Sequence, residues 1–179
     1  MNEGSLSLAS GGVNRIVDQL PDDVEAAVKD LLAVACERDV TLATAESCTG
    51  GLLAALLTDV EGCSHVFERG FVTYTEDAKT EMLGVDRQLI DAEGAVSKAV
   101  AWAMAEGGLK ASEADIVLAV TGFAGEAGPE GEAGLVHLAC ARRGGSLIHR
   151  EEHFGNVGRG RIRIQTIRVA IEMMREAMR

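Results

Sequence analysis

The chain has 179 residues, of which 47% are apolar and 25% charged, a composition typical of one ordinary globular domain. No apolar run approaches the roughly 20 residues that a membrane-spanning helix needs, and the first 13 residues lack the features of a signal peptide. The net charge of −11 opposes nonspecific attraction to nucleic acid or to anionic membranes. We therefore expect a soluble cytoplasmic protein with no nucleic-acid partner and no membrane partner.

Positive charge is concentrated at the carboxyl end of the sequence. Residues 157–179 contain six arginines and two glutamates, a local charge of +4 that leaves −15 for the rest of the chain. Because guanidinium groups bind phosphate and carboxylate groups well, this segment is suited to attract a small anion.

The first half of the chain begins with a segment that offers little to bury. We expect residues 1–19 to be a flexible tail and residues 20–179 to form the domain. After Pro21, apolar residues spaced three and four apart predict an amphipathic helix. Residues 41–47 then predict a short strand that leads through a tight turn into a buried helix starting near Thr49.

The second half continues the alternation of strands and helices. The sequence predicts a strand over residues 67–75, a short helix around 77–83, a helix over 97–109 and a buried strand over 115–122. Gly144 and Gly145 join two further strands into a hairpin, and a terminal helix follows them. These elements predict an α/β fold, a single domain with a mixed β-sheet and helices on both faces.

In such folds, chemistry gathers in the loops at the carboxyl ends of strands, and the first of these loops reads TAESCTGG. A serine between a strand and a helix start lies near free backbone N–H groups, which suits a nucleophile or an anion site. Ser47 is the candidate, although a plain helix cap explains the same residues. The segment is not the G-x-S-x-G elbow of α/β-hydrolases. Cys48 is a weaker candidate nucleophile, because small buried cysteines are more common than reactive ones.

The second loop places Tyr74 at a strand end and Lys79 five residues later, so that both can face the same loop. A desolvated lysine has a lowered pKa and can take a proton from a serine hydroxyl. The alternative is a half-buried strand tyrosine and a solvated helix lysine, and spacing leaves both interpretations open.

The third loop, after Val120, is rich in glycine but carries no Walker motif and no clean dinucleotide fingerprint. The four histidines are scattered, and the four cysteines contain no C-x-x-C pair. We therefore expect no metal and no disulfide framework.

Taken in order, these motifs resemble one known family. TAESCTGG, FERGFVTYTEDAK, GAVS, ADIVLAVTGFAG, GLVHLA and the closing GRGRIR are similar to the competence-damage-inducible CinA carboxyl-terminal domain, whose members include nicotinamide mononucleotide deamidases. The resemblance covers roughly residues 20–178, and the length implies the stand-alone form without the additional amino-terminal domain. It implies a metal-independent amidohydrolase, without an organic cofactor, that converts nicotinamide mononucleotide, a pyridine mononucleotide, to nicotinate mononucleotide and ammonia.

The resemblance also implies roles for particular residues. The catalytic serine, tyrosine and lysine of the family fall on Ser47, Tyr74 and Lys79. The matching motifs also imply a set of substrate-binding residues: Cys48, Thr49, Gly50, Gly51, Thr121, Gly122, Arg159 and Arg161. Backbone N–H groups from Cys48 to Gly51 are expected to stabilise the oxyanion, and either Arg159 or Arg161 is expected to contact the phosphate.

One segment departs from the family pattern. The loop over residues 126–132 carries extra glutamates, and carboxylates close to a phosphate repel it. The alternative function is a noncatalytic nucleotide-binding or regulatory module with the same fold. A role in DNA uptake, which the family name implies, fits poorly with the negative charge. An apolar hairpin edge and the terminal helix also leave surfaces for a homodimer.

Overall fold

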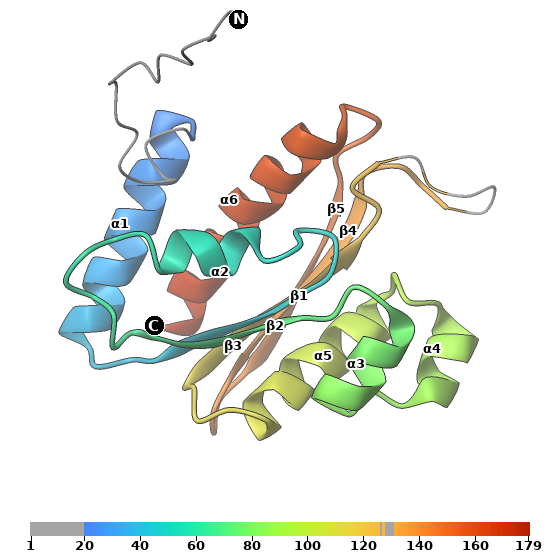
Figure 1. Cartoon of the computed structure of the whole chain (residues 1–179), viewed down its shortest axis with the longest axis horizontal. Coiled ribbons are helices and arrows are strands. Elements are labelled where there is room, and N and C mark those ends of the chain that lie inside the picture. Colours follow the sequence, from blue (N-terminus) through green and yellow to red (C-terminus); the bar gives the residue numbers. More distant parts are fainter. Residues whose placement is uncertain (1–19, 126, 128–130) are drawn as a thin grey trace, which may run out of the picture.

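The computed structural model describes residues 20–125, 127 and 131–179, so the expected tail over 1–19 lies outside the described residues (Figure 1). Five strands form one sheet in the order β2-β1-β3-β4-β5. They are β1 (Leu42–Glu46), β2 (Phe67–Val72), β3 (Ile116–Gly122), β4 (Leu135–Arg142) and β5 (Leu147–His153). β1 runs parallel to β2 and β3, whereas β4 is antiparallel to β3 and β5. The predicted mixed sheet and its hairpin are confirmed.

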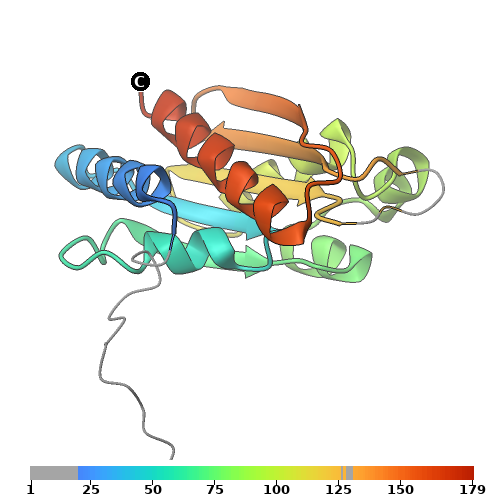
Figure 2. The same cartoon turned by 90° about the horizontal axis from the view of Figure 1, so that it is seen from above.

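Helices cover both faces of the sheet, as predicted. One face carries α1 (Asp22–Glu37), α2 (Leu52–Leu57) and α6 (Arg159–Ala177), and the other carries α3 (Glu76–Leu83), α4 (Arg87–Glu93) and α5 (Lys98–Lys110) (Figures 1 and 2). Alternate residues of β3 therefore enter different cores, with Leu118 beneath α1 and α6 and Val117 beneath α5. None of the described helices combines the length and the hydropathy needed to cross a bilayer.

Two glycines let α5 approach its neighbours closely. A Cβ atom on Gly107 would lie 2.0 Å from the carbonyl oxygen of Leu83, and one on Gly108 would lie 2.7 Å from a methyl group of Val117. Because neither backbone nor a buried valine can yield that much space, glycine is required at both positions. This packing fixes α3, which carries Lys79, against the sheet through α5.

The structure differs from the sequence predictions in four local details. β2 ends at Val72 rather than at residue 75, so Tyr74 follows the strand instead of ending it. α2 starts at Leu52 rather than near Thr49, because Gly50 and Gly51 adopt left-handed φ angles of 65° and 90° and delay the helix. α4 was not predicted, since its seven residues are too few to show a helical period. The hairpin turn spans residues 143–146 rather than two residues, and only the first of its glycines, Gly144, has a positive φ, of 68°.

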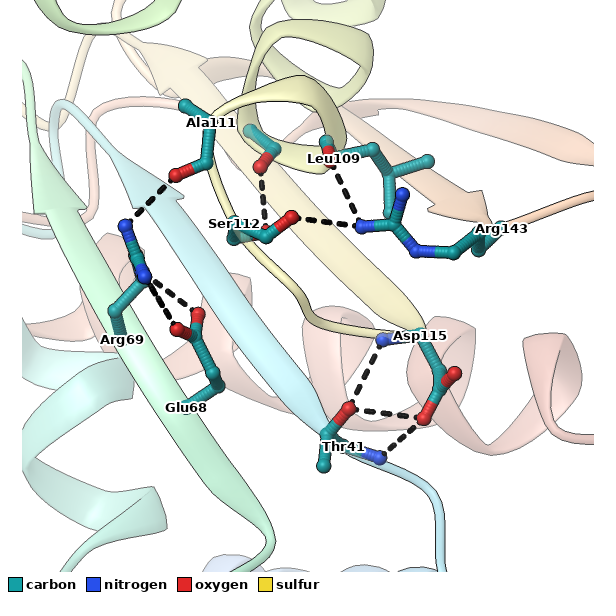
Figure 3. A network of polar contacts seen from close by, with 9 residues as sticks. Thr41, Glu68, Arg69, Leu109, Ala111, Ser112, Asp115 and Arg143 are labelled. Atoms are coloured by element: carbon teal, nitrogen blue, oxygen red, sulfur yellow. Dashed lines mark hydrogen bonds and ion pairs between the residues drawn. The ribbon is translucent and has the colours of Figure 1, made fainter.

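A network of polar groups closes the end of the sheet where β1 and β3 begin. The carboxylate of Asp115 accepts hydrogen bonds from the backbone N–H and the hydroxyl of Thr41, at 2.8 and 2.9 Å. Arg143 donates to the carbonyls of Leu109 and Ser112, at the end of α5 and just beyond it, and Arg69 donates to that of Ala111 (Figure 3). Arg143 also donates to the carbonyl of Ala114. We call Thr41, Arg69, Asp115 and Arg143 the amino-end network. The positive charges of Arg69 and Arg143 also interact favourably with the negative end of the α5 dipole.

Candidate active site

Ser47 lies immediately after β1, at the opposite end of the sheet from the amino-end network. Its N–H donates to the carbonyl of Val120 in β3 at 3.0 Å, and its carbonyl accepts from Gly50 at 3.0 Å. The two left-handed glycines that follow turn the chain sharply into α2. Ser47 is therefore held between two parallel strands at their carboxyl ends, with its side chain 8% exposed.

Glu46 holds this turn in place, a role that the sequence analysis missed. Its carboxylate is fully buried and accepts hydrogen bonds from the amides of Gly51, Leu53 and Ala54 at 3.1, 3.1 and 2.8 Å. These bonds satisfy the free N–H groups at the start of α2 and offset the cost of burying a charge. An acidic residue shortly before a predicted helix start was the available signal.

Lys79 reaches Ser47 from the other side of the cavity. It lies in α3, whose N-cap Thr75 accepts a hydrogen bond from Ala78. The Lys79 Nζ lies 3.2 Å from the Ser47 Oγ and donates to the carbonyl of Thr73 at 2.8 Å. With 1% of its surface exposed, Lys79 is the largest fully buried side chain in the described structure.

Burial controls the charge of this lysine. Desolvation lowers the pKa of Lys79, and the nearby thiol of Cys48 and carboxylate of Glu76 oppose the shift only in part. In the part of the chain that the structure describes, no carboxylate forms an ion pair with the Lys79 ammonium. The arrangement therefore favours a neutral amine, whose free electron pair can accept the proton of the Ser47 hydroxyl.

Ser47 and Lys79 line a cavity of about 370 Å³ at the carboxyl ends of the strands. Thr121 and Gly122, from the end of β3, line it too, and the Thr121 hydroxyl donates to the carbonyl of Ala95 at 2.7 Å. Gly122 lets the β3 and β4 backbones meet, since a Cβ there would lie 2.8 Å from the carbonyl of Leu135. The volume suits a small organic molecule.

Tyr74 also lines the cavity but does not join the pair. Its side chain is 60% exposed, and it forms no hydrogen bond with Ser47 or Lys79. The structure thus brings two of the three expected catalytic residues into contact and places the third at the exposed side of the cavity. Its ring remains available to a bound molecule.

Cys48 lines the cavity as a poor nucleophile. Burial raises the pKa of its thiol to about 11, so the reactive thiolate is scarce near neutral pH. Its carbonyl accepts a hydrogen bond from the Arg163 Nε at 2.9 Å. These contacts favour the interpretation in which Cys48 supplies backbone groups and Ser47 supplies the reactive side chain.

The backbone donors differ from the expected set. The Gly50 amide already donates to the Ser47 carbonyl and the Gly51 amide to Glu46, so neither is free for an oxyanion. Within the described residues, the amides of Cys48 and Thr49 donate to no oxygen atom, and of the four residues from 48 to 51 only Cys48 lines the cavity. The expectation for Gly50 and Gly51 is corrected because helix capping and the turn use their N–H groups.

The two candidate arginines occupy different places. Arg159, the first residue of α6, lines the cavity with Ser47, whereas Arg161 lines a separate depression beside Pro21 and Arg168. The pattern of arginines did not distinguish them, because a helix sends positions two apart to different sides. Arg163, which sequence reasoning also missed, lies one helical turn after Arg159 and contacts the Ser47 turn.

Most of the glutamate-rich loop, including residues 126 and 128–130, lies outside the described residues. Of its glutamates, Glu132 is described, and its carboxylate lies 2.8 Å from the Nδ1 of His153. This pairing raises the pKa of His153. Over the described ranges 20–125, 127 and 131–179, no group of three histidine, cysteine, aspartate or glutamate side chains is arranged to hold a metal ion.

Comparison with known proteins places these features in a family. The model of the CinA C-terminal domain matches residues 23–178. A CinA-like protein of Akkermansia muciniphila is 55% identical over 118 residues, which cover 63% of this chain and 28% of the relative. One from Syntrophus aciditrophicus is 42% identical over 156 residues, or 86% of this chain and 36% of the relative. The chain thus spans about a third of the length of these curated relatives.

A solved structure agrees over nearly its whole length. The crystal structure of the competence/damage inducible protein CihA from Agrobacterium tumefaciens superposes with a TM-score of 0.87 at 44% identity, covering 89% of this chain and 98% of that one. A competence damage-inducible protein from Klebsiella pneumoniae gives 0.81 at 30% identity, covering 87% and 96%. The family model covers most of the chain and the fold agrees with these solved structures, so the chain belongs to the CinA C-terminal domain family.

Proposed function

We propose that this domain is an amidohydrolase that converts nicotinamide mononucleotide to nicotinate mononucleotide and ammonia. The observation that carries the proposal is the 3.2 Å contact between the Ser47 Oγ and the Lys79 Nζ inside a cavity. A serine hydroxyl becomes a nucleophile when a neighbouring base takes its proton, and lysine replaces histidine in one known form of that pair. Membership of the family supports the substrate class.

The reaction proceeds in two halves. Neutral Lys79 accepts the hydroxyl proton as the Ser47 Oγ attacks the carboxamide carbon, and the protonated lysine then gives that proton to the departing ammonia. The product is an ester of Ser47. Lys79 next takes a proton from a water molecule, whose oxygen attacks the ester, and the proton returns to the Ser47 Oγ as the acid is released.

The negative charge that develops on the carbonyl oxygen needs a hydrogen-bond donor. Cys48 follows the nucleophile directly and lines the cavity, so we assign its backbone N–H as the hydrogen-bond donor to the oxyanion. The partly exposed ring of Tyr74 is suited to lie against the positively charged pyridinium ring, which gives it a binding role instead of one in proton transfer.

Arg159 supplies the phosphate contact in this proposal. It begins α6, a 19-residue helix whose positive N-terminal end also attracts anions. Arg163 adds a second positive charge one turn further along, beside the Cys48 carbonyl. The cavity therefore combines a nucleophile at its buried end with positive charge at its side, as a neutral amide linked to a phosphate requires.

The test is release of ammonia and nicotinate mononucleotide from nicotinamide mononucleotide by the purified chain. Ser47→Ala should abolish turnover, whereas Ser64→Ala, which removes an exposed hydroxyl from the α2–β2 loop, should leave it unchanged. Binding of the nucleotide by calorimetry without product would instead indicate a noncatalytic binding module. Full turnover by Ser47→Ala would show that the nucleophile is another group.

A further inference from the structure

Two cysteines that are 27 residues apart in the sequence lie near each other on the side of the sheet that α1 covers. Cys36 lies in the last turn of α1, and Cys63 lies in the loop between α2 and β2. The carbonyl of Cys63 accepts a hydrogen bond from Val66 at 3.0 Å, and the carbonyl of Val66 accepts one from Leu42 at 2.7 Å. These bonds hold the loop against the start of β1, where the end of α1 also lies.

The two thiols are neighbours, and a histidine adjoins one of them. The His65 Nε2 lies 3.6 Å from the Cys36 Sγ, which brings Cys36 to the segment that carries Cys63, two residues before His65. Burial raises the pKa of Cys63, and the neighbouring Cys36 sulfur raises it further. Cys36 is therefore the thiol that has an imidazole beside its sulfur to accept the proton.

The site is accessible, unlike the other two cysteines. Cys36 and Cys63 are both partly exposed and His65 is exposed, whereas Cys48 and Cys140 are buried. Burial raises the pKa of Cys48 to about 11 and that of Cys140 to about 12. Oxidation selects thiols that an oxidant can reach, so we expect the accessible pair to react and the two buried thiols to serve as internal controls.

We propose that Cys36 and Cys63 form a dithiol site that a peroxide oxidises to a disulfide within one chain, with His65 as the base. The Cys36 thiolate attacks a peroxide oxygen, which breaks the O–O bond and gives a sulfenic acid and water when the oxidant is hydrogen peroxide. The Cys63 sulfur then attacks the Cys36 sulfur, and the hydroxyl group leaves as a second water. The closed loop encloses β1, the Ser47 turn and α2.

This pairing escaped the sequence analysis, which excluded a disulfide framework from the spacing of the cysteines. The spacing carried no signal because the tertiary fold, and not a short motif, brings residues 36 and 63 together. The proposal concerns one reversible bond between two cysteines that are free thiols in the structure.

Treatment of the full chain with hydrogen peroxide tests the proposal. We expect two of the four thiols to disappear, the intact mass of the monomer to fall by two hydrogen atoms, and peptide mapping to link residues 36 and 63. Reduction by dithiothreitol should restore both thiols. Four remaining thiols, a link to Cys48 or Cys140, or a covalent dimer in place of the internal bond would overturn the proposal.

Single variants separate the steps. Cys63→Ser should stop the reaction at a sulfenic acid on Cys36, which a 1,3-dione reagent traps, and Cys36→Ser should yield no trapped adduct on Cys63. His65→Asn should slow oxidation about 10-fold relative to the Ser64→Ala control next to it. An unchanged rate in His65→Asn would overturn the role of the imidazole, and an adduct on Cys63 in Cys36→Ser would overturn the assignment of the attacking thiol.

Discussion

The two ends of the sheet use polar residues in opposite ways. Where β1 and β3 begin, Asp115 bonds two groups of Thr41, and Arg143 and Arg69 bond four carbonyls at or near the end of α5. Where the same strands end, the Lys79 amine is buried beside a serine hydroxyl and an open cavity, with no carboxylate partner among the described residues. The amino-end network gives its charged groups hydrogen-bond partners, whereas the carboxyl end buries an amine without a counterion.

This difference indicates that the amino-end network mainly stabilises the fold, whereas the carboxyl end of the sheet mainly carries the chemistry. Satisfied polar groups at the amino end lower the energy of the folded chain, and removing one leaves its partners unbonded. A buried lysine without a counterion costs stability in its charged form, and that cost lowers its pKa toward the range that a general base needs. Variants at the two ends should therefore affect different measurements.

The largest effect is expected for Lys79→Met, which keeps the shape of the side chain and removes its amine. Turnover should fall about 1,000-fold, equivalent to about 4 kcal/mol, because Lys79 is the only base that contacts the Ser47 hydroxyl among the described residues. The melting temperature should stay the same or rise, since a buried group that is costly to charge is removed. Steady-state kinetics and thermal unfolding of the same preparation check both, and a large drop in stability would contradict the separation.

At the opposite end, Asp115→Ala should lower the free energy of unfolding by about 2 kcal/mol, because the N–H and hydroxyl of Thr41 lose their acceptor. The turnover number of the folded chain should not change. Denaturant unfolding measures the loss, with Glu113→Ala as the control for an exposed carboxylate nearby. A reduced turnover number in Asp115→Ala would show that the two ends are coupled.

A smaller effect is expected from the arginines of α6. Arg159→Ala should raise KM about 10-fold with little change in kcat, because a phosphate contact contributes equally to the ground state and the transition state. Arg161→Ala is the matched control, since this residue faces another depression two positions along the same helix. Equal effects from both variants would contradict the assignment of the phosphate to Arg159.

The smallest effect is a dependence of stability on pH. The pKa of Lys79 is lower in the folded chain than in the unfolded chain, so between the two values the unfolded state binds more protons. The destabilisation that comes from burying a charged Lys79 is fully present below the pKa of Lys79 in the folded chain. It is relieved as the pH rises from there toward the ordinary pKa of lysine. The free energy of unfolding should thus rise more with alkaline pH in the native chain than in Lys79→Met, which urea titrations at several pH values measure.

Sequence patterns predicted much of the fold and part of the site. The apolar run of β3 and the helical spacing in α1 and α6 are set by burial, which leaves a period in the sequence. Parallel strands also end at one edge, so residues after β1 and β2 were expected to face each other. The contact between Ser47 and Lys79 follows from that topology.

Other features depend on local geometry that no periodic pattern encodes. The Glu46 carboxylate accepts hydrogen bonds from backbone amides that come within its reach only because two left-handed glycines turn the chain. The choice between Arg159 and Arg161 depends on the phase of α6 relative to the cavity, and the exposure of Tyr74 depends on how far β2 extends before α3. The meeting of Cys36 and Cys63 depends on the packing of α1 beside a loop.

A double-mutant cycle in kcat/KM tests most directly whether Ser47 and Lys79 act as one catalytic unit. Removing either member of such a unit already eliminates its contribution, so a second substitution should add little. We predict that Ser47→Ala, Lys79→Ala and the double variant have equally low activity with nicotinamide mononucleotide, within about threefold. Losses that multiply, with the double variant slower by the product of the two single losses, would contradict the account.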